Sequence, residues 1–109
     1  MTHEMKLDLV PFEQIKAGTK TIEIRLNDER RQLLNVGDEI TFSLMADQGQ
    51  KVSVRVLELL HFNSFKDLFE ALPPERDGAV SKEYKDMYKY YSEEDEDKYG
   101  VLGIRFIKL

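Results

Sequence analysis

The chain has 109 residues, which suffices for a single domain over residues 1–109 and excludes two independent hydrophobic cores. Its residues are 41% hydrophobic and 34% charged, a balance that excludes a disordered chain and predicts a soluble globular domain. The formal net charge of −5 argues against strong, non-specific binding of long nucleic acids, but it is compatible with a pocket for one or two nucleotides.

Three features of the sequence concern the cellular compartment. The absence of cysteine favours a reducing interior. The first six residues hold no apolar run, so we expect no signal peptide. No uncharged apolar stretch approaches the ~20 residues that a membrane helix needs. We therefore expect a cytoplasmic protein with no membrane partner.

The first third of the chain predicts two strands and two short helices. Apolar and polar residues alternate over residues 3–9, as in a half-buried strand. A proline at its start and a glycine after its end bound a short helix over residues 11–17. The alternating, β-branched segment 21–26 predicts the second strand. An asparagine or aspartate then caps a short helix that ends at Leu34, and residues 36–38 form a turn.

The middle of the chain predicts a hairpin followed by a helix. Residues 39–45 and 52–61 have strand patterns and are joined by the polar turn 46–50. Ser64, with an aspartate three residues later, resembles a capping box for a helix over residues 65–72.

The last third predicts a helix over about residues 82–91, a helical turn capped by Ser92, and a closing strand over residues 101–107. Five consecutive acids, residues 93–97, begin that turn, where they oppose the positive end of the helix dipole. Removing them would bring the formal charge from −5 to zero, so the excess acid is one patch. In all, five strands with short inserted helices predict an α+β domain built on a small, mostly antiparallel β-barrel.

Residues 18–25 contain the clearest candidate site. A glycine ends the first helix, Lys20 begins the second strand, and Glu23 and Arg25 lie two residues apart on one strand face. Arg25 offers a planar fork for phosphate or a base edge, and Lys20 a point charge for phosphate. Glu23 can orient Arg25, accept a hydrogen bond or move a proton. The plainer alternative is a solvated Glu–Arg pair, worth roughly 0–1 kcal/mol.

The pattern Gly18-x-Lys20-x-x-Glu23-x-Arg25 resembles the signature of the ASCH family, the activating signal cointegrator homology domains related to PUA domains. Flanking segments also resemble small bacterial members of the family: Pro11-Phe12 and residues 15–18, 36–38 and 100–104. The resemblance implies a PUA-like barrel of five to six strands, a cleft lined by the motif, and RNA, a nucleotide or a nucleoside as partner. The binding residues would be Lys20, Glu23, Arg25 and Lys16.

The resemblance also leaves a hydrolase as the alternative function, acting on RNA as a ribonuclease or on a modified nucleoside. One branch of the family hydrolyses N(4)-acetylcytidine with the motif lysine, a threonine three residues later and a separate glutamate. Lys20 matches that lysine, but Glu23 stands where the threonine would be. Lys20 and Glu23 remain candidate general bases. Glu58, Glu75 and Glu83 are available as the third residue.

Other polar residues point to no metal and no cofactor. His3 and His61 are far apart in sequence and make no zinc motif, and His3 is better explained as a satisfied histidine at the rim of the core. The acids at 93–97 lack the spacing of a calcium loop and are better explained as a solvated helix start. Arg30 and Arg31 flank the motif and are candidate phosphate contacts, or ordinary exposed charges.

An aromatic face recurs at helical spacing, formed by Tyr84, Met87, Tyr88 and Tyr91. Packing against the barrel is the favoured explanation. Two functional alternatives stay open: one or two of these rings border the cleft and stack on a base, or another protein binds to this face or to the acidic patch.

Overall fold

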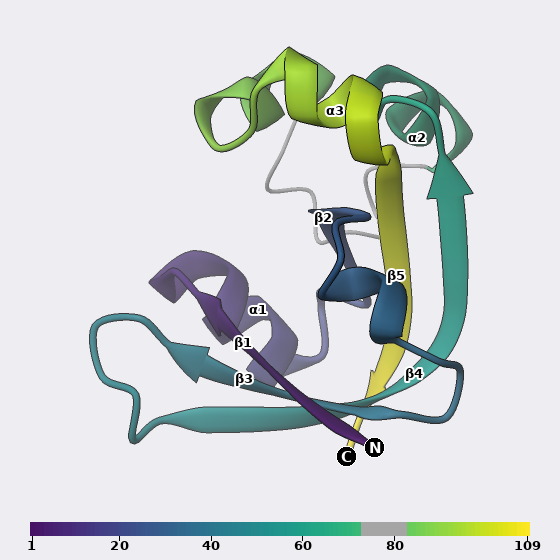
Figure 1. The fold of residues 1–109 in the computed structure, drawn as a ribbon. Coiled ribbons are helices and arrows are strands. Elements are labelled where there is room, and N and C mark those ends of the chain that lie inside the picture. The colour runs from purple at the N-terminus through teal and green to yellow at the C-terminus, as the bar shows by residue number, and fades with distance from the viewer. Residues whose placement is uncertain (73–82) are drawn as a thin grey trace.

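The computed structural model describes residues 1–72 and 83–109 as a curled five-stranded sheet with short helices around it (Figure 1). From edge to edge the strands are β1 (Thr2–Leu7), β3 (Glu39–Leu44), β4 (Lys51–Phe62), β5 (Val101–Lys108) and β2 (Ile22–Leu26). Neighbouring strands are antiparallel except β1 and β3, which are parallel. The predicted α+β fold with a mostly antiparallel sheet is therefore confirmed.

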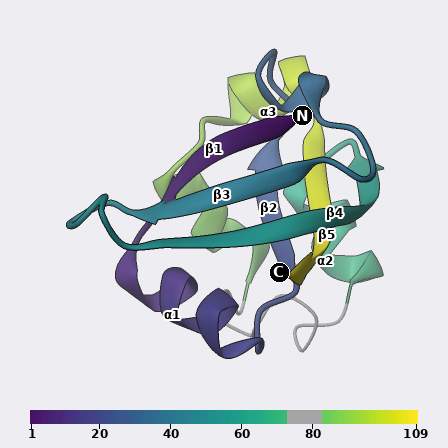
Figure 2. The same cartoon turned by 90° about the horizontal axis from the view of Figure 1, so that it is seen from below.

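The sheet is a half-barrel and not a closed barrel, so the predicted β-barrel is present only in part. β1 and β2 are its two edges, and among the described residues each of them pairs with one neighbour only. Seen from below, β1, β3 and β4 lie side by side while β2 runs across them (Figure 2). We call the boundary between the two edge strands the seam. Sequence patterns predict strands, but they do not predict whether the first and last strand of a sheet meet.

The long strand β4 belongs to both parts of the half-barrel. Its beginning pairs with β3, and its second half pairs with β5. Between Val56 and Glu58 the register shifts, and such a bulge bends a strand. Figure 1 shows β4 curving from the base of the molecule up along β5. This bend places the two sheet edges opposite each other.

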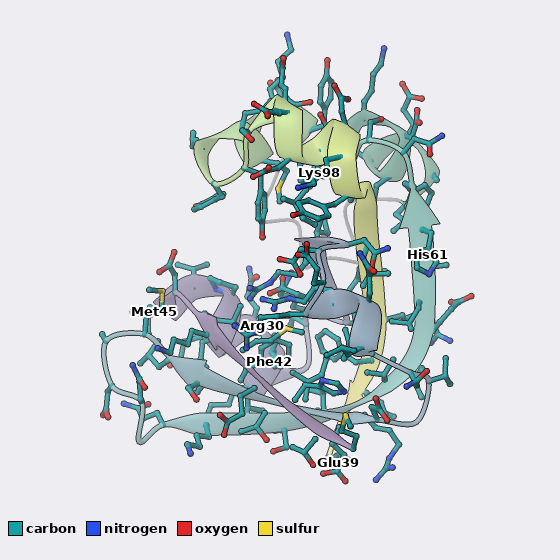
Figure 3. The ribbon with its side chains drawn as sticks, in the orientation of Figure 1. Arg30, Glu39, Phe42, Met45, His61 and Lys98 are labelled. Atoms are coloured by element: carbon teal, nitrogen blue, oxygen red, sulfur yellow. The ribbon has the colours of Figure 1, made fainter. Side chains whose placement is uncertain are left out.

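Two hydrophobic clusters hold the sheet and helices together. The first lies between β1, α1 (Leu9–Ala17) and the lower sheet, with Phe42 fully buried inside the curve of the sheet (Figure 3). The second joins β2 to α2 (Phe65–Ala71) and includes Ile22 and Ile24. The two isoleucines of the motif thus anchor β2 in the core, as the alternation of that strand predicts.

The predicted signals at Gly18, Ser64 and Ser92 are confirmed, but α1 begins at Leu9 and not at Pro11. The first N–H groups of a helix have no partner within it, so a proline also fits at the third position. Gly18 ends α1 with a φ of 82°, a left-handed conformation that glycine adopts without strain. The hydroxyl of Ser64 accepts a hydrogen bond from Asp67 N at 3.1 Å at the start of α2. Ser92 accepts one from Asp95 N at 3.1 Å at the start of α3 (Glu93–Tyr99). None of the helices in these parts of the chain has the length and apolar character to span a membrane.

Two further segments form 3₁₀ turns. Asp28 accepts a hydrogen bond at 3.1 Å from the N–H of Arg31, the first residue of η1 (Arg31–Leu33), whose N-cap residue is Arg30. The helix predicted over residues 82–91 is instead the 3₁₀ helix η3 (Tyr84–Lys89), and residue 82 lies outside the described residues. Among the residues that the structure describes, no side chain caps the start of η3. Its aromatic side chains also lose rotamer freedom in an α-helix, which favours the shorter structure.

The aromatic face packs inward, as favoured from the sequence. Met87 is buried in the second cluster, and Tyr84, Tyr88 and Tyr91 pack against that cluster. The ring of Tyr91 stacks on Phe65, with centroids 5.5 Å apart and planes at 24°. Because this face is covered, the alternative of a protein-binding aromatic stripe loses its basis.

The acidic run is only partly solvated, which corrects the expectation from its composition. Glu96 is 4% exposed, whereas the other four acids of residues 93–97 are exposed. Its carboxylate accepts hydrogen bonds from Phe65 N at 2.7 Å and from the Tyr88 hydroxyl at 2.8 Å. A residue of α3 thus satisfies the first backbone N–H of α2, a group that a helix itself leaves unpaired.

We expect the substitution Glu96→Ala to destabilise the fold by about 1–3 kcal/mol, because it leaves the buried Phe65 N–H and Tyr88 hydroxyl without an acceptor. The measurement is the urea midpoint at neutral pH, followed by circular dichroism. Glu94→Ala, at an exposed position of the same helix, is the control, with an expected change within about 0.5 kcal/mol. Equal midpoints for both variants would contradict the role given to Glu96.

Candidate functional site

The seam between the sheet edges is bridged by arginine side chains. Arg25 on β2 donates from Nη2 to the Lys6 carbonyl oxygen on β1 at 3.0 Å. Arg30, just before η1, donates from Nη2 to the Glu4 carbonyl oxygen at 3.4 Å. These two carbonyl groups lie two residues apart on β1, so both point away from β3 toward the seam. Side chains therefore occupy the place where a closed barrel would have backbone pairing.

The three charged residues of the motif lie together beside this seam. Glu23 Oε2 accepts hydrogen bonds from Arg25 Nη2 at 2.9 Å and from Arg25 Nε at 3.2 Å. Glu23 Oε1 accepts one from Ile24 N at 3.2 Å and lies 3.5 Å from Lys20 Nζ. Lys20 Nζ also donates to the Ile22 carbonyl oxygen at 2.7 Å.

Burial distinguishes this group from a surface ion pair. Lys20 and Glu23 are each 7% exposed, and the side chain of Arg25 is 16% exposed. The plainer alternative of a solvated strand-face pair is therefore wrong. In the structure the side chains of Lys20, Glu23 and Arg25 lie together, as predicted.

The environment keeps Glu23 ionised. Burial alone raises the pKa of Glu23, but the charges of Lys20 and Arg25 and the hydrogen bonds from Arg25 and Ile24 N outweigh it and lower the pKa below 4.5. A carboxylate in this state is a weak proton acceptor at neutral pH. Its geometry suits the task of orienting Arg25.

Acidification is expected to remove the stabilisation that this carboxylate provides. Because the folded-state pKa of Glu23 lies below the ordinary value of 4.5, the contribution is complete above pH 4.5 and is lost as the pH falls through the folded-state pKa. The urea midpoint of Glu23→Gln should consequently fall less than that of the unchanged protein between about pH 5 and pH 3. Parallel pH profiles for the two proteins would contradict this assignment.

A cleft of about 390 Å³ opens above the motif, and we call it the seam cleft. Lys20, Glu23 and Arg25 line one part of it. The other lining residues come from segments far away in the sequence: Lys6, Leu7, Asp8, Pro11, Ile24, Met45, Met87, Tyr90 and Tyr91. Charged groups thus lie next to an apolar and aromatic wall, a composition typical of small-molecule sites.

Two tyrosines border the seam cleft. Tyr91 belongs to the aromatic face identified from the sequence, and burial raises the pKa of its hydroxyl. Tyr90 lies off that face, and the sequence analysis did not identify it. In the structure it is 69% exposed and lines the cleft. Helical periodicity singles out residues that pack inward, so it could not identify a ring that faces the opening.

Of the remaining predicted binding residues, Lys16 lies apart from the cleft and the two arginines lie beside it. Lys16 is exposed on α1, and its carbonyl oxygen accepts a hydrogen bond from Lys108 Nζ at 2.9 Å. Arg30 and Arg31 line a second hollow, which shares Lys6 and Arg25 with the seam cleft.

The residues considered for a hydrolase are dispersed. Thr21 is exposed and does not line the seam cleft. Glu58 pairs with Arg105 at 2.9 Å on the surface, and Glu83 is exposed and also absent from the lining. Glu75 lies outside the described residues.

The two histidines are also separated. His3 Nε2 lies 2.8 Å from Asp38 Oδ2, so it is the satisfied rim histidine that the strand pattern favours. His61 is exposed on the outer side of β4 (Figure 3). In the two ranges that the structure describes, no three histidine or carboxylate residues form a group able to hold a metal ion.

Comparisons with known proteins agree on one family. The family model for the ASCH domain matches residues 5–109. The crystal structure of hypothetical protein PH0355 is 35% identical in sequence, with a TM-score of 0.87 and complete coverage of both chains. The solution NMR structure of protein PF0455 from Pyrococcus furiosus is 33% identical, with a TM-score of 0.76, and covers 100% of this chain and 98% of that one. No match was found among curated proteins.

Proposed function

Because this chain belongs to the ASCH domain family, we propose that it binds RNA or a nucleotide in the seam cleft, through Lys20, Glu23 and Arg25. The observation that carries the proposal is the hydrogen bonding of the Glu23 carboxylate. Both of its oxygens accept hydrogen bonds, and Arg25 supplies two of the donors. The guanidinium group is thereby fixed at the wall of a cleft before any ligand arrives, which reduces the entropy lost on binding.

The guanidinium group retains donors for a ligand. The hydrogen bonds to Glu23 and to the Lys6 carbonyl use Nε and Nη2 of Arg25, and none of them uses Nη1. A planar guanidinium is well suited to phosphate oxygens and to the acceptor edge of a base. Lys20, buried beside it, adds positive charge to the same wall.

Other lining residues of the seam cleft suit a base. Pro11, Met45, Tyr90 and Tyr91 offer apolar and aromatic surface next to the charged groups. A volume of about 390 Å³ is at the lower end of the range for ligand sites, which fits a single nucleotide unit better than a folded RNA element. Lys16, exposed on α1, would contact phosphate only in an RNA that extends beyond the cleft.

Binding is favoured over hydrolysis. A general base must be able to accept a proton at neutral pH, and the lowered pKa of Glu23 makes that residue a poor one. The described glutamates proposed as a third catalytic residue, Glu58 and Glu83, do not line the seam cleft. The charged groups that do line it are arranged to hold a ligand.

The test of this function is titration calorimetry with the four ribonucleoside 5′-monophosphates and with short single-stranded RNA. Replacing Tyr90 by alanine is expected to weaken binding by about 1–3 kcal/mol, because a base loses its stacking partner. The urea midpoint should stay unchanged, since this side chain is 69% exposed. Tyr90→Phe keeps the ring and should bind like the unchanged protein. Absence of binding by the unchanged protein to all of these ligands would overturn the proposal.

A further inference from the structure

A second hollow adjoins the seam cleft and is markedly basic. It has a volume of about 590 Å³ and shares Lys6 and Arg25 with the cleft, so the two spaces adjoin at these residues. We call it the basic hollow. Its lining residues are Glu4, Met5, Lys6, Arg25, Arg30, Arg31, Ser43, Gln48 and Lys51. Arg30, labelled in Figure 3, enters it from the segment that follows β2.

The charge balance of this hollow is the reverse of that of the chain. Five of its lining residues are lysine or arginine and one is acidic, whereas the whole chain has a formal charge of −5. The cations come from three separate parts of the sequence, namely β1, residues 25–31 and the start of β4. Folding therefore collects them from distant positions in spite of their mutual repulsion.

Most of these cations lack an anionic partner. Within residues 1–72 and 83–109, Lys6, Arg30, Arg31 and Lys51 form no ion pair. Nε of Arg31 is buried and makes no hydrogen bond in the same part of the chain. The charge of Asp28 acts on Arg31, but this carboxylate accepts its hydrogen bond from the Arg31 backbone N–H and not from the guanidinium. A buried donor without an acceptor is costly, and an anionic ligand would supply the acceptor.

The local electrostatics agree with this geometry. Burial, followed by the charges of Arg25 and Arg30, lowers the pKa of Arg31, and the charge of Asp28 opposes the shift only in part. Ser43 and Gln48 add uncharged hydrogen-bonding groups to the same lining. A cluster of arginine, lysine and hydroxyl groups is suited to a tetrahedral oxyanion that carries up to two negative charges.

We propose that the basic hollow binds a phosphate group of the ligand whose base occupies the seam cleft. Arg25 lines both spaces, so it would contact the ligand where base and phosphate are joined through the ribose. This inference rests on the proposed function and makes it more specific: the ligand is a nucleotide, free or within RNA, and a nucleoside is only part of it. Lys6 and Lys51, which sequence reasoning did not single out, become phosphate-binding residues together with Arg30 and Arg31.

The experiment compares nucleosides with their 5′- and 3′-monophosphates in calorimetric titrations. For the unchanged protein, at least one of the two monophosphates should bind about tenfold to a hundredfold more tightly than its nucleoside, as charge-assisted hydrogen bonds would provide. In the double variant Arg31→Gln, Lys51→Gln this advantage should shrink to about twofold or less. Its nucleoside affinity should stay unchanged, because neither residue lines the seam cleft. Arg55→Gln, Arg105→Gln removes two surface charges outside both hollows and is the matched control.

The outcomes separate this inference from the proposed function. Nucleosides that bind as tightly as both of their monophosphates would overturn the phosphate site and leave the seam cleft as a base-binding site. A double variant that keeps the full phosphate advantage would also overturn it. Failure of nucleosides, nucleotides and RNA alike to bind the unchanged protein would overturn both. Salt provides an independent check: between about 50 and 200 mM, affinity should fall for the monophosphate and stay constant for the nucleoside.

Discussion

Replacing Glu23 by glutamine is expected to destabilise the fold by about 3–5 kcal/mol, the cost of removing one partner from a buried ion pair. The substitution leaves two largely buried cations, Lys20 and Arg25, without their common carboxylate. Native domains are stable by only about 5–15 kcal/mol, so the loss should be visible as a large shift of the urea midpoint. The measurement is equilibrium unfolding followed by circular dichroism at neutral pH.

The chain contains a matched control for this variant. Glu39 and Arg55 form an ion pair at 3.0 Å with side chains 40% and 46% exposed, whereas the Glu23–Arg25 pair is buried. Glu39→Gln should change stability by no more than about 1 kcal/mol. If Glu23→Gln cost no more than Glu39→Gln, the carboxylate would not be the centre of the charged group, and the preorganisation of Arg25 would lose its cause.

The second large effect is expected at Arg25 itself. The variant Arg25→Lys retains a positive charge for Glu23, but its donors lie on one nitrogen. It therefore lacks the planar fork that donates from Nε and Nη2 to Glu23 and to the Lys6 carbonyl and leaves Nη1 for a ligand. We expect nucleotide affinity to fall about tenfold to a hundredfold. The measurement is the same calorimetric titration that tests the proposed function.

Stability must be measured in parallel, because Arg25 also bridges the seam. Arg55→Lys makes the same chemical change on a surface arginine that lines neither hollow, and its affinity should equal that of the unchanged protein. If Arg25→Lys folds and binds nucleotides as tightly as this control, the guanidinium group has no special role in binding.

Local features of the fold were predictable because their causes are local. A serine followed three residues later by an aspartate caps a helix whatever lies around it, and both Ser64 and Ser92 do so. Side chains alternate between the two faces of β2, so Glu23 and Arg25 lie on one face and Ile24, between them, packs in the core. The three motif residues of the candidate site could therefore be identified from the sequence.

What depends on distant contacts was not predictable from the sequence. β4 has a register shift between Val56 and Glu58, and the described edge strands β1 and β2 do not pair with each other. Neither feature has a clear sequence signal. Lys6, Met45 and Tyr90 reach the cleft from three separate segments, and no spacing rule links them. Glu96 resembles its acidic neighbours in sequence, and only the position of α2 makes it a buried acceptor.

Arginine side chains, and not a backbone ladder, join the two sheet edges across the seam in the described part of the chain. The five-residue pairing of β2 with β5 would have to be broken as a ladder, but the two guanidinium contacts can be exchanged one at a time. At about 0.5–1.5 kcal/mol for each net hydrogen bond, parting the two strand edges costs little compared with unfolding. Parting β1 from β2 would therefore break side-chain contacts across the seam and leave the described backbone ladders in place.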